Sequence, residues 1–173
     1  MEIKNITYIK KNAFRLLVIL WACVIFFMSS MNANESNEKS KGTINEIVEK
    51  TVEVTNEIGI TNIDQTKTNI EQITNKLNPP LRKVAHASEY CVFTILIIIV
   101  LKNSKLKNKK IYLIAISICF IYACTDEYHQ TFVNGRTGQF IDTLIDTLGG
   151  IIGCTLHYII NKKITHKHKT QWI

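Results

Sequence analysis

The sequence predicts an all-α, polytopic membrane protein: a bundle of four transmembrane helices with an amphipathic helical insertion on the extracellular side. Apolar residues make up 46% of the chain, and they gather in four runs instead of recurring periodically as they would in a soluble domain. Lysines flank these runs, as expected for segments that cross a membrane. Four apolar runs with basic flanks therefore favour a membrane bundle over a soluble fold.

The basic composition does not indicate nucleic-acid binding. The formal net charge is +7, but the basic residues flank apolar runs and form no single stripe, so we expect no nucleic-acid partner. The 5 cysteines are odd in number and lie in or beside apolar runs, which predicts neither a disulfide framework nor a metal-binding CxxC pair. We expect no cofactor.

The four spans follow from the length that a helix needs to cross a bilayer, about 20 mostly apolar residues. The uncharged part of the third run ends at Cys124, so this helix has to continue past Asp126 to be long enough. A cleaved signal peptide is an alternative for the first run, but that run is long and no A-x-A pattern follows it. The predicted spans are residues 13–31, 81–101, 111–128 and 140–160.

The distribution of lysine predicts which connections face the cytoplasm. Lysines concentrate in residues 1–12, 102–110 and 161–173, and short cytoplasmic flanks are the ones that carry such an excess. The remaining connections, residues 32–80 and 129–139, are then extracellular. Both termini are therefore expected to be cytoplasmic.

The long extracellular segment is expected to combine a linker with amphipathic helix. Residues 32–42 are rich in Asn, Ser, Glu and Lys and predict a flexible linker. After them, apolar residues and one threonine recur at helical spacing, which predicts one or two helices that lie on the membrane or pair with another helix; a partly disordered loop is the alternative. These residues are Ile44, Ile47, Thr51, Val54, Ile58, Ile63, Ile70 and Leu77. Asn78-Pro79-Pro80 is expected to end the segment.

Ionisable residues inside the last three spans are the strongest functional signal. A charge in hydrocarbon costs several kcal/mol, roughly, so such residues usually face the bundle interior and mark a functional site. In each span they fall near the predicted outer end, within about 10 Å of the surface at 1.5 Å rise per residue. With the polar neighbours that share their helix faces, they are His86, Glu89 and Tyr90, then Asp126, Glu127, His129 and Gln130, then Asp142 and Asp146.

Two arginines are expected beside this group. Arg136 follows an Asn-Gly turn between the last two spans, where it would lie near four carboxylates and either neutralise them or bind an anionic headgroup. Arg82 stands with Lys83 at the outer end of the second span, where both can meet lipid phosphates or the nearby acids. Three spans and one loop thus predict a single polar site.

Two features of the last span indicate packing and not chemistry. Gly149 and Gly153 have a small-xxx-small spacing, which lets another helix approach closely. His157 is a lone polar residue in the inner half of this span, and we expect it to be hydrogen-bonded within the bundle and not to act as a ligand.

The polar residues resemble the VanZ-like family, whose pattern covers nearly all of the predicted spans but not residues 44–77. Asn134 and Asp146 depart from it, since proline and asparagine are usual there. The matching motifs are Ser29-Ser30, Arg82-Lys83-x-x-His86-x-x-Glu89-Tyr90, Asp126-Glu127-x-x-Gln130-x-Phe132-x-x-Gly135-Arg136, and Asp142 with Gly149 and Gly153. The resemblance implies a small bacterial plasma-membrane protein, associated with low-level resistance to glycopeptides such as teicoplanin, but no defined reaction.

Three functions remain open from the sequence. In the first, the polar cluster binds a membrane lipid, a lipid-linked cell-wall precursor or a glycopeptide at the outer leaflet. In the second, the protein is an intramembrane enzyme in which His86 or His129 is the general base and Glu89 or Asp126 the general acid. Metal assistance through such His–carboxylate pairs is conceivable, but we assign no metal ligands. In the third, the polar residues only join the helices.

Overall fold

The protein is helical throughout its described part, as the sequence predicts. A computed structural model describes residues 2–60 and 67–170, and it describes side chains within residues 11–60 and 69–163. No strand occurs among these residues, so the predicted all-α class is confirmed. The helices are α1 (Glu2–Ser30), α2 (Ala33–Glu57), α3 (Lys67–Leu101), α4 (Asn108–Gln130) and α5 (Phe140–Thr170).

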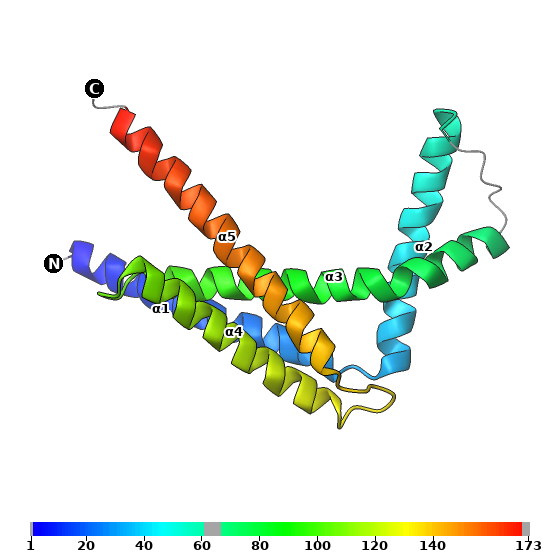
Figure 1. The fold of residues 1–173 in the computed structure, drawn as a ribbon, viewed down its shortest axis with the longest axis horizontal. Helices are drawn as coiled ribbons and strands as arrows, with labels where there is room; N and C mark the ends of the chain where they lie inside the picture. The colour runs from blue at the N-terminus through cyan, green and yellow to red at the C-terminus, as the bar shows by residue number, and fades with distance from the viewer. Residues whose placement is uncertain (1, 61–66, 171–173) are drawn as a thin grey trace.

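All of these helices except α2 are long and apolar enough to cross a membrane. The candidate spans are Lys11–Ser30, Asn69–Leu101, Asn108–Gln130 and Phe140–Lys163. Figure 1 shows α1, α3 and α4 running along one another, while α5 crosses them diagonally and α2 stands across α3. The four-helix membrane bundle is therefore confirmed, and α2 with the start of α3 forms the insertion.

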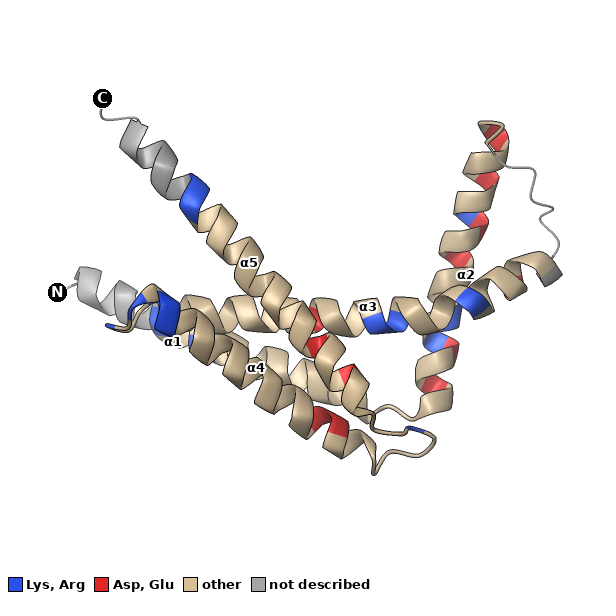
Figure 2. Cartoon of the chain, in the orientation of Figure 1, with Lys and Arg blue, Asp and Glu red and all other residues tan. Residues whose placement is uncertain are grey.

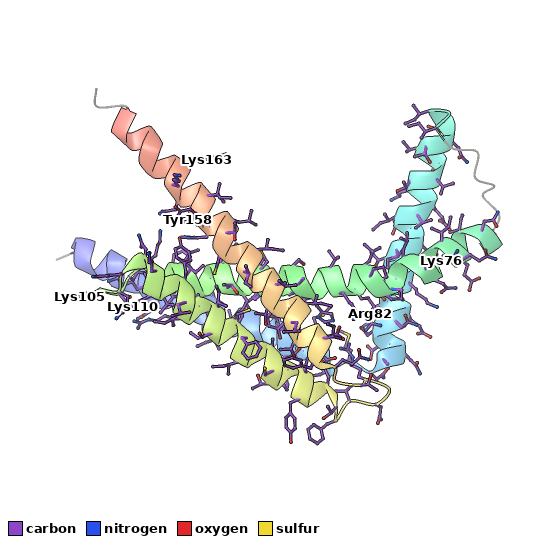
Figure 3. All side chains as sticks on the ribbon, viewed as in Figure 1. Lys76, Arg82, Lys105, Lys110, Tyr158 and Lys163 are labelled. Atoms are coloured by element: carbon purple, nitrogen blue, oxygen red, sulfur yellow. The ribbon has the colours of Figure 1, made fainter. Side chains whose placement is uncertain are left out.

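The two ends of the bundle differ in charge. At one end, which we call the lysine end, α3 is connected to α4, and Figure 3 shows Lys105 and Lys110 there. At the other end, residues 131–139 connect α4 to α5 and α1 turns into α2. We call this the cavity end, because the cavity described below opens there. Figure 2 shows that acidic residues occur on α2 and towards the cavity end of the bundle. Acids inside the bundle thus gather on one side of the membrane.

The core of the bundle lies between α3 and α4, with α1 and α5 against it. Its buried residues include Tyr90, Ile98, Ala115 and Cys119. Two hydrogen bonds attach α1 to this core: the Trp21 indole N–H donates to the carbonyl of Glu89 at 3.0 Å, and the Tyr122 hydroxyl donates to the carbonyl of Ala22 at 2.6 Å. In hydrocarbon such bonds have no competition from water, so they fix how α1 sits on the other helices. On α5, His157 bonds the Tyr112 hydroxyl at 3.1 Å, the internal hydrogen bond that we expected of it.

Glycines set the distance between α3 and α5, the two helices with the most extensive contact. A methyl group at Gly149 would collide with the carbonyl oxygen of Ala87, and one at Gly153 with the carbonyl oxygen of Cys91. The predicted close approach of a second helix is therefore confirmed, and that helix is α3. This contact brings the acids of α5 next to the polar face of α3.

The prediction of a flexible linker at residues 32–42 was wrong, because α2 begins at Ala33. The Asn32 side chain caps this helix by accepting a hydrogen bond from the Glu35 N–H at 2.8 Å, which satisfies one of the free donors of the first turn. An i,i+4 ion pair between Glu35 and Lys39 at 2.8 Å adds to its stability. Polar composition alone suggested a linker, but these residues also suit a capped, solvated helix.

The face of α2 that is buried also differs from the prediction. Ile44 is buried as expected, but its buried partners on α2 are Val48 and Val52, which pack against Ile70 of α3. The other residues of the predicted stripe point away from this contact and are exposed: Ile47, Thr51, Val54 and Ile58 on α2 and Leu77 on α3. Ile63 lies outside the described residues.

Polar pairs explain this rotation of α2, because they join it to α3 just before Pro79 and Pro80. The prediction that the segment ends at these prolines was wrong, since α3 continues through both. Asn78, only 3% exposed, accepts a hydrogen bond from the Ser40 hydroxyl at 2.8 Å and donates one to Asn37. The Thr74 hydroxyl likewise donates to Asn45. A different rotation of α2 would leave these groups without partners, which costs about 1–3 kcal/mol for each buried group.

A larger side chain at Gly149 should separate α3 from α5. We expect Gly149→Leu to lower the free energy of unfolding by about 1–3 kcal/mol or more, because overpacking against a backbone carbonyl cannot relax by a rotamer change. The measurement is the unfolding temperature of purified protein in detergent. The matched control is Gly42→Leu, since nothing lies within 4 Å of an added Cβ at Gly42. Equal unfolding temperatures for both variants would show that the close contact does not stabilise the fold.

Candidate functional site

A cavity of about 250 Å³ opens at the cavity end of the bundle, between α3, α5, the end of α4 and the loop of residues 131–139. Most of the residues singled out from the sequence line it. They are Arg82, His86, Glu127, Gln130, Arg136, Asp142 and Asp146. Lys83 and Gln139 line it as well. The polar site that the sequence predicted from three spans and a loop is thus assembled in one place.

Three carboxylates lie together at the buried side of this cavity, a group that we call its acidic floor. Asp126, Glu127 and Asp146 each offer an oxygen, and these oxygens lie within 4.8 Å of one another. The three residues are only 3%, 7% and 3% exposed, respectively. Asp126 does not line the cavity itself, so it lies beneath the other two. Buried acids this close together repel one another unless protons, donors or cations compensate their charge.

Gln130 connects these acids to the arginine above them. Its side-chain amide donates to Asp126 at 3.2 Å and to Glu127 at 3.0 Å, while its carbonyl oxygen accepts from Arg136 at 3.2 Å. The donors and acceptors around it allow only this orientation of the amide. Arg136 is therefore connected to the carboxylates by hydrogen bonds through the neutral side chain of Gln130 and not by a direct ion pair.

The loop after α4 holds Glu127 in place by a backbone contact. The Gln139 N–H donates to the second oxygen of Glu127 at 2.9 Å. Gly138 packs so closely on the carbonyl of Glu127 that a side chain at this position would collide with it. Sequence analysis missed Gln139, because a backbone amide that finds a carboxylate 12 residues away leaves no signal in residue type.

Arg136 is positioned by neutral partners and keeps donors free. Its guanidinium donates to Gln130 and, at 3.4 Å, to the carbonyl of Met28, and its buried Nε–H has no partner. Burial lowers the pKa of this group from its usual value, yet an arginine stays charged near neutral pH. Within the described residues it forms no direct ion pair with the nearby carboxylates, so it does not neutralise them by contact.

Two further cationic side chains, Lys83 and Arg82, line the cavity and contact neighbouring residues. Lys83 forms an ion pair with Asp142, and both side chains are partly exposed. Arg82 donates to the hydroxyl of Ser36 on α2 at 3.0 Å, and Figure 3 shows it where α2 meets α3. The sequence suggested that Lys83 meets either a lipid phosphate or a nearby acid, and the ion pair with Asp142 is the second of these contacts. The cavity therefore has a basic rim over an acidic floor.

The comparison with known protein families covers the part of the chain that forms this site. Residues 14–161 match the family model described as VanZ/LLP1. The chain belongs to the VanZ/LLP1 family. This confirms the resemblance found in the sequence, and the matched range includes every residue of the cavity. The comparisons with curated proteins and with solved structures found no match.

In this VanZ/LLP1 protein, two of the acid–base candidates lie away from the acidic floor. Glu89 lines a second, smaller cavity of about 230 Å³ beside α2, where its carboxylate lies 3.5 Å from Nδ1 of His86. His86 lines both cavities and so stands between them. His129 faces α1, with its ring 4.3 Å from that of Phe26, and does not approach the cavity.

Tyr90 and Ser29 complete the surroundings of the acids from below. Both are fully buried, and their hydroxyls have no hydrogen-bond partner among the described residues. Each of them interacts with Asp126. Tyr90 was singled out from the sequence because it shares a helix face with His86. Ser29 was singled out only through the resemblance to the family, because a serine at the end of a span does not by itself indicate a functional site.

Removing the amide of Gln130 should weaken the whole site of this VanZ/LLP1 protein. We expect Gln130→Leu to lower the free energy of unfolding by about 1–3 kcal/mol, because Asp126 and Glu127 lose a buried donor. Thermal unfolding in detergent measures this. Gln139→Ala serves as the control, because it keeps the backbone N–H that Glu127 uses and removes only an exposed side chain. If Gln130→Leu unfolded at the wild-type temperature, the amide would not be holding the acids.

Proposed function

We propose that this VanZ/LLP1 protein binds the phosphate-bearing headgroup of a lipid or lipid-linked cell-wall precursor at the outer leaflet of a bacterial plasma membrane. This binding would contribute to low-level resistance to glycopeptides of the teicoplanin type. The observation that carries the proposal is the cavity with three cationic side chains at its rim, Arg82, Lys83 and Arg136. Arg82 and Lys83 belong to a membrane-spanning helix, where charged side chains usually have a function.

The chemistry of the rim supports an anionic headgroup. Arginine presents paired donors that match phosphate oxygens, and charge-assisted hydrogen bonds are the stronger class. Among the described residues, the Nε–H of Arg136 has no acceptor, and the partner of the Arg82 guanidinium is the Ser36 hydroxyl. Below the rim, Gln130 and the carboxylates can accept hydrogen bonds from hydroxyl or amine groups of the same headgroup.

The size of the cavity favours a headgroup over a whole antibiotic. Pockets that enclose a drug-sized ligand measure about 300–1,000 Å³, and this cavity measures about 250 Å³. A phosphate with a few sugar or glycerol atoms fits within that volume, whereas a glycopeptide does not. An effect on glycopeptides would then arise through the lipid or precursor and not by enclosing the drug.

The charges at the two ends of the bundle support an outward-facing cavity. The lysine end carries the connection with Lys102, Lys105, Lys107, Lys109 and Lys110. Lysine-rich short loops stay in the cytoplasm, so the cavity end would face outward. An outward cavity is the one that can reach cell-wall precursors.

Intramembrane acid–base catalysis is a second candidate, favoured by one contact. His86 lines the cavity and lies 3.5 Å from Glu89, an arrangement in which a carboxylate can orient an imidazole that takes up a proton. The comparison of lipid extracts from cells with wild-type protein and with Glu89→Gln separates the two. A lipid species that is modified only by the wild type favours the enzyme, whereas unchanged lipids favour the binder.

Loss of the Arg136 charge should weaken binding of lipid phosphate. We expect Arg136→Gln to reduce the affinity for a polyprenyl phosphate about tenfold to a hundredfold, the equivalent of a charge-assisted hydrogen bond of about 1.5–3 kcal/mol. Native mass spectrometry of the protein in a phosphate-free detergent measures the bound lipid. The polyprenyl alcohol, which shares the tail and lacks the phosphate, should bind weakly to all variants.

The control for this experiment is Lys50→Gln, which removes a cation in an exposed ion pair with Glu46 on α2. It should leave lipid binding unchanged, since it lies outside the cavity. Equal retention of the phosphate and the alcohol by the wild type would refute phosphate recognition. Teicoplanin susceptibility of cells that carry the same variants at equal abundance then tests the link to resistance.

A further inference from the structure

The acids at the floor of the cavity have His86 and Arg136 near them but no direct ion pair among the described residues. Within the described part of the chain, no lysine, arginine or histidine lies within ion-pair distance of Asp126, Glu127 or Asp146. The donors within hydrogen-bond distance of them are the amide of Gln130 and the N–H of Gln139, and the hydroxyls of Ser29 and Tyr90 also interact with Asp126; all four groups are neutral. Buried carboxylates in such a state take up protons or coordinate a cation.

A second observation at the same place indicates that a ligand is missing. The Tyr90 hydroxyl is fully buried and has no partner at hydrogen-bond distance among the described residues, although it lies beside Asp126 and Asp146 and interacts with both. One oxygen of Asp126, Oδ1, is also buried and without a partner. Buried polar atoms are nearly always satisfied, so two such atoms beside the same acids point to a group that completes their contacts.

We propose that Asp126, Glu127 and Asp146 bind a divalent metal ion of the Mg²⁺ class at the floor of the cavity. The inference rests on the proposed function for its purpose: the ion would bind a phosphate oxygen of the lipid headgroup from below, while Arg136 binds the phosphate from the rim. A dication at this point compensates the clustered charge, and a water on the ion can donate a hydrogen bond to the Tyr90 hydroxyl oxygen.

The donor set selects the kind of metal. All three side chains offer oxygen, and oxygen ligands suit Mg²⁺, Mn²⁺ or Ca²⁺ more than metals that prefer nitrogen or sulfur. Mg²⁺ is usually held by one or two carboxylates and keeps positions for water and for substrate phosphates, so the third acid here can also bind through a water on the ion. Glu127 and Asp146 line the cavity while Asp126 lies beneath, so an ion among them faces the space where a phosphate would enter. This site differs from the His–carboxylate pairs considered from the sequence, because His129 faces α1.

The test uses Mn²⁺ as a spectroscopic substitute for Mg²⁺. Purified full-length protein in a phosphate-free detergent is titrated with Mn²⁺, and free Mn²⁺ is followed by electron paramagnetic resonance. We expect one saturable site per chain, from which excess Mg²⁺ displaces Mn²⁺. Asp146→Asn should weaken Mn²⁺ binding at least tenfold, whereas Glu46→Gln, which removes an exposed acid on α2, should not change it.

The stability of Asp146→Asn without metal distinguishes a metal ligand from a structural residue. Asparagine has nearly the same shape and removes one of three repelling charges, so the unfolding temperature in EDTA should stay the same or rise. If the unfolding temperature falls instead, the Mn²⁺ affinity of Asp126→Asn and the Mn²⁺ stoichiometry of the wild type decide whether these acids bind the ion. No saturable Mn²⁺ site in the wild type, or unchanged affinity in both variants, overturns the proposal and favours carboxylates that share protons.

Lipid binding in EDTA separates this inference from the proposed function. Retention of polyprenyl phosphate should fall at least tenfold in EDTA and return with Mg²⁺. If the wild type retains the lipid equally well in EDTA and has no Mn²⁺ site, the metal inference fails and the binding function stands. If Mn²⁺ binds as expected but the lipid phosphate never does, the metal site stands and the proposed function fails.

Discussion

The burial of Asp126, Glu127 and Asp146 next to one another is the constraint on which the rest of the site depends. Carboxylates in an apolar bundle are costly unless their oxygens are satisfied, and here the neighbouring elements supply the contacts. Gln130 donates to two of the acids, and the loop donates a backbone N–H to Glu127. The cavity is thus a consequence of arranging donors around acids that the bundle cannot expose to lipid.

The close contact between α3 and α5 brings the members of this site next to one another. Because Gly149 and Gly153 let the two backbones touch, Asp146 comes to the acids of α4, and Asp142 comes to Lys83 of α3. Packing and chemistry are therefore coupled in this protein. A change that separates the helices would also separate the members of the site.

The insertion formed by α2 and the start of α3 adds a second layer at the same end of the bundle. Hydrogen bonds to Asn78 and Thr74 hold α2 against the start of α3, and α3 continues through two prolines, so Arg82 follows on the same helix. Arg82 then reaches Ser36 of α2. The insertion consequently shapes one wall of the cavity, although its residues were expected to form a separate linker and helix.

Composition and spacing were enough to predict the spans, the polar faces and the small-residue contact, because each of these depends on periodicity along a single helix. Membership of the VanZ/LLP1 family followed from the same residues. Which partner each polar group finds depends on the relative rotation of helices, and periodicity does not contain that information. The tertiary structure alone decided that Arg136 bonds Gln130 and not a carboxylate, that His129 turns to α1, and that α2 buries Val48 and not Ile47.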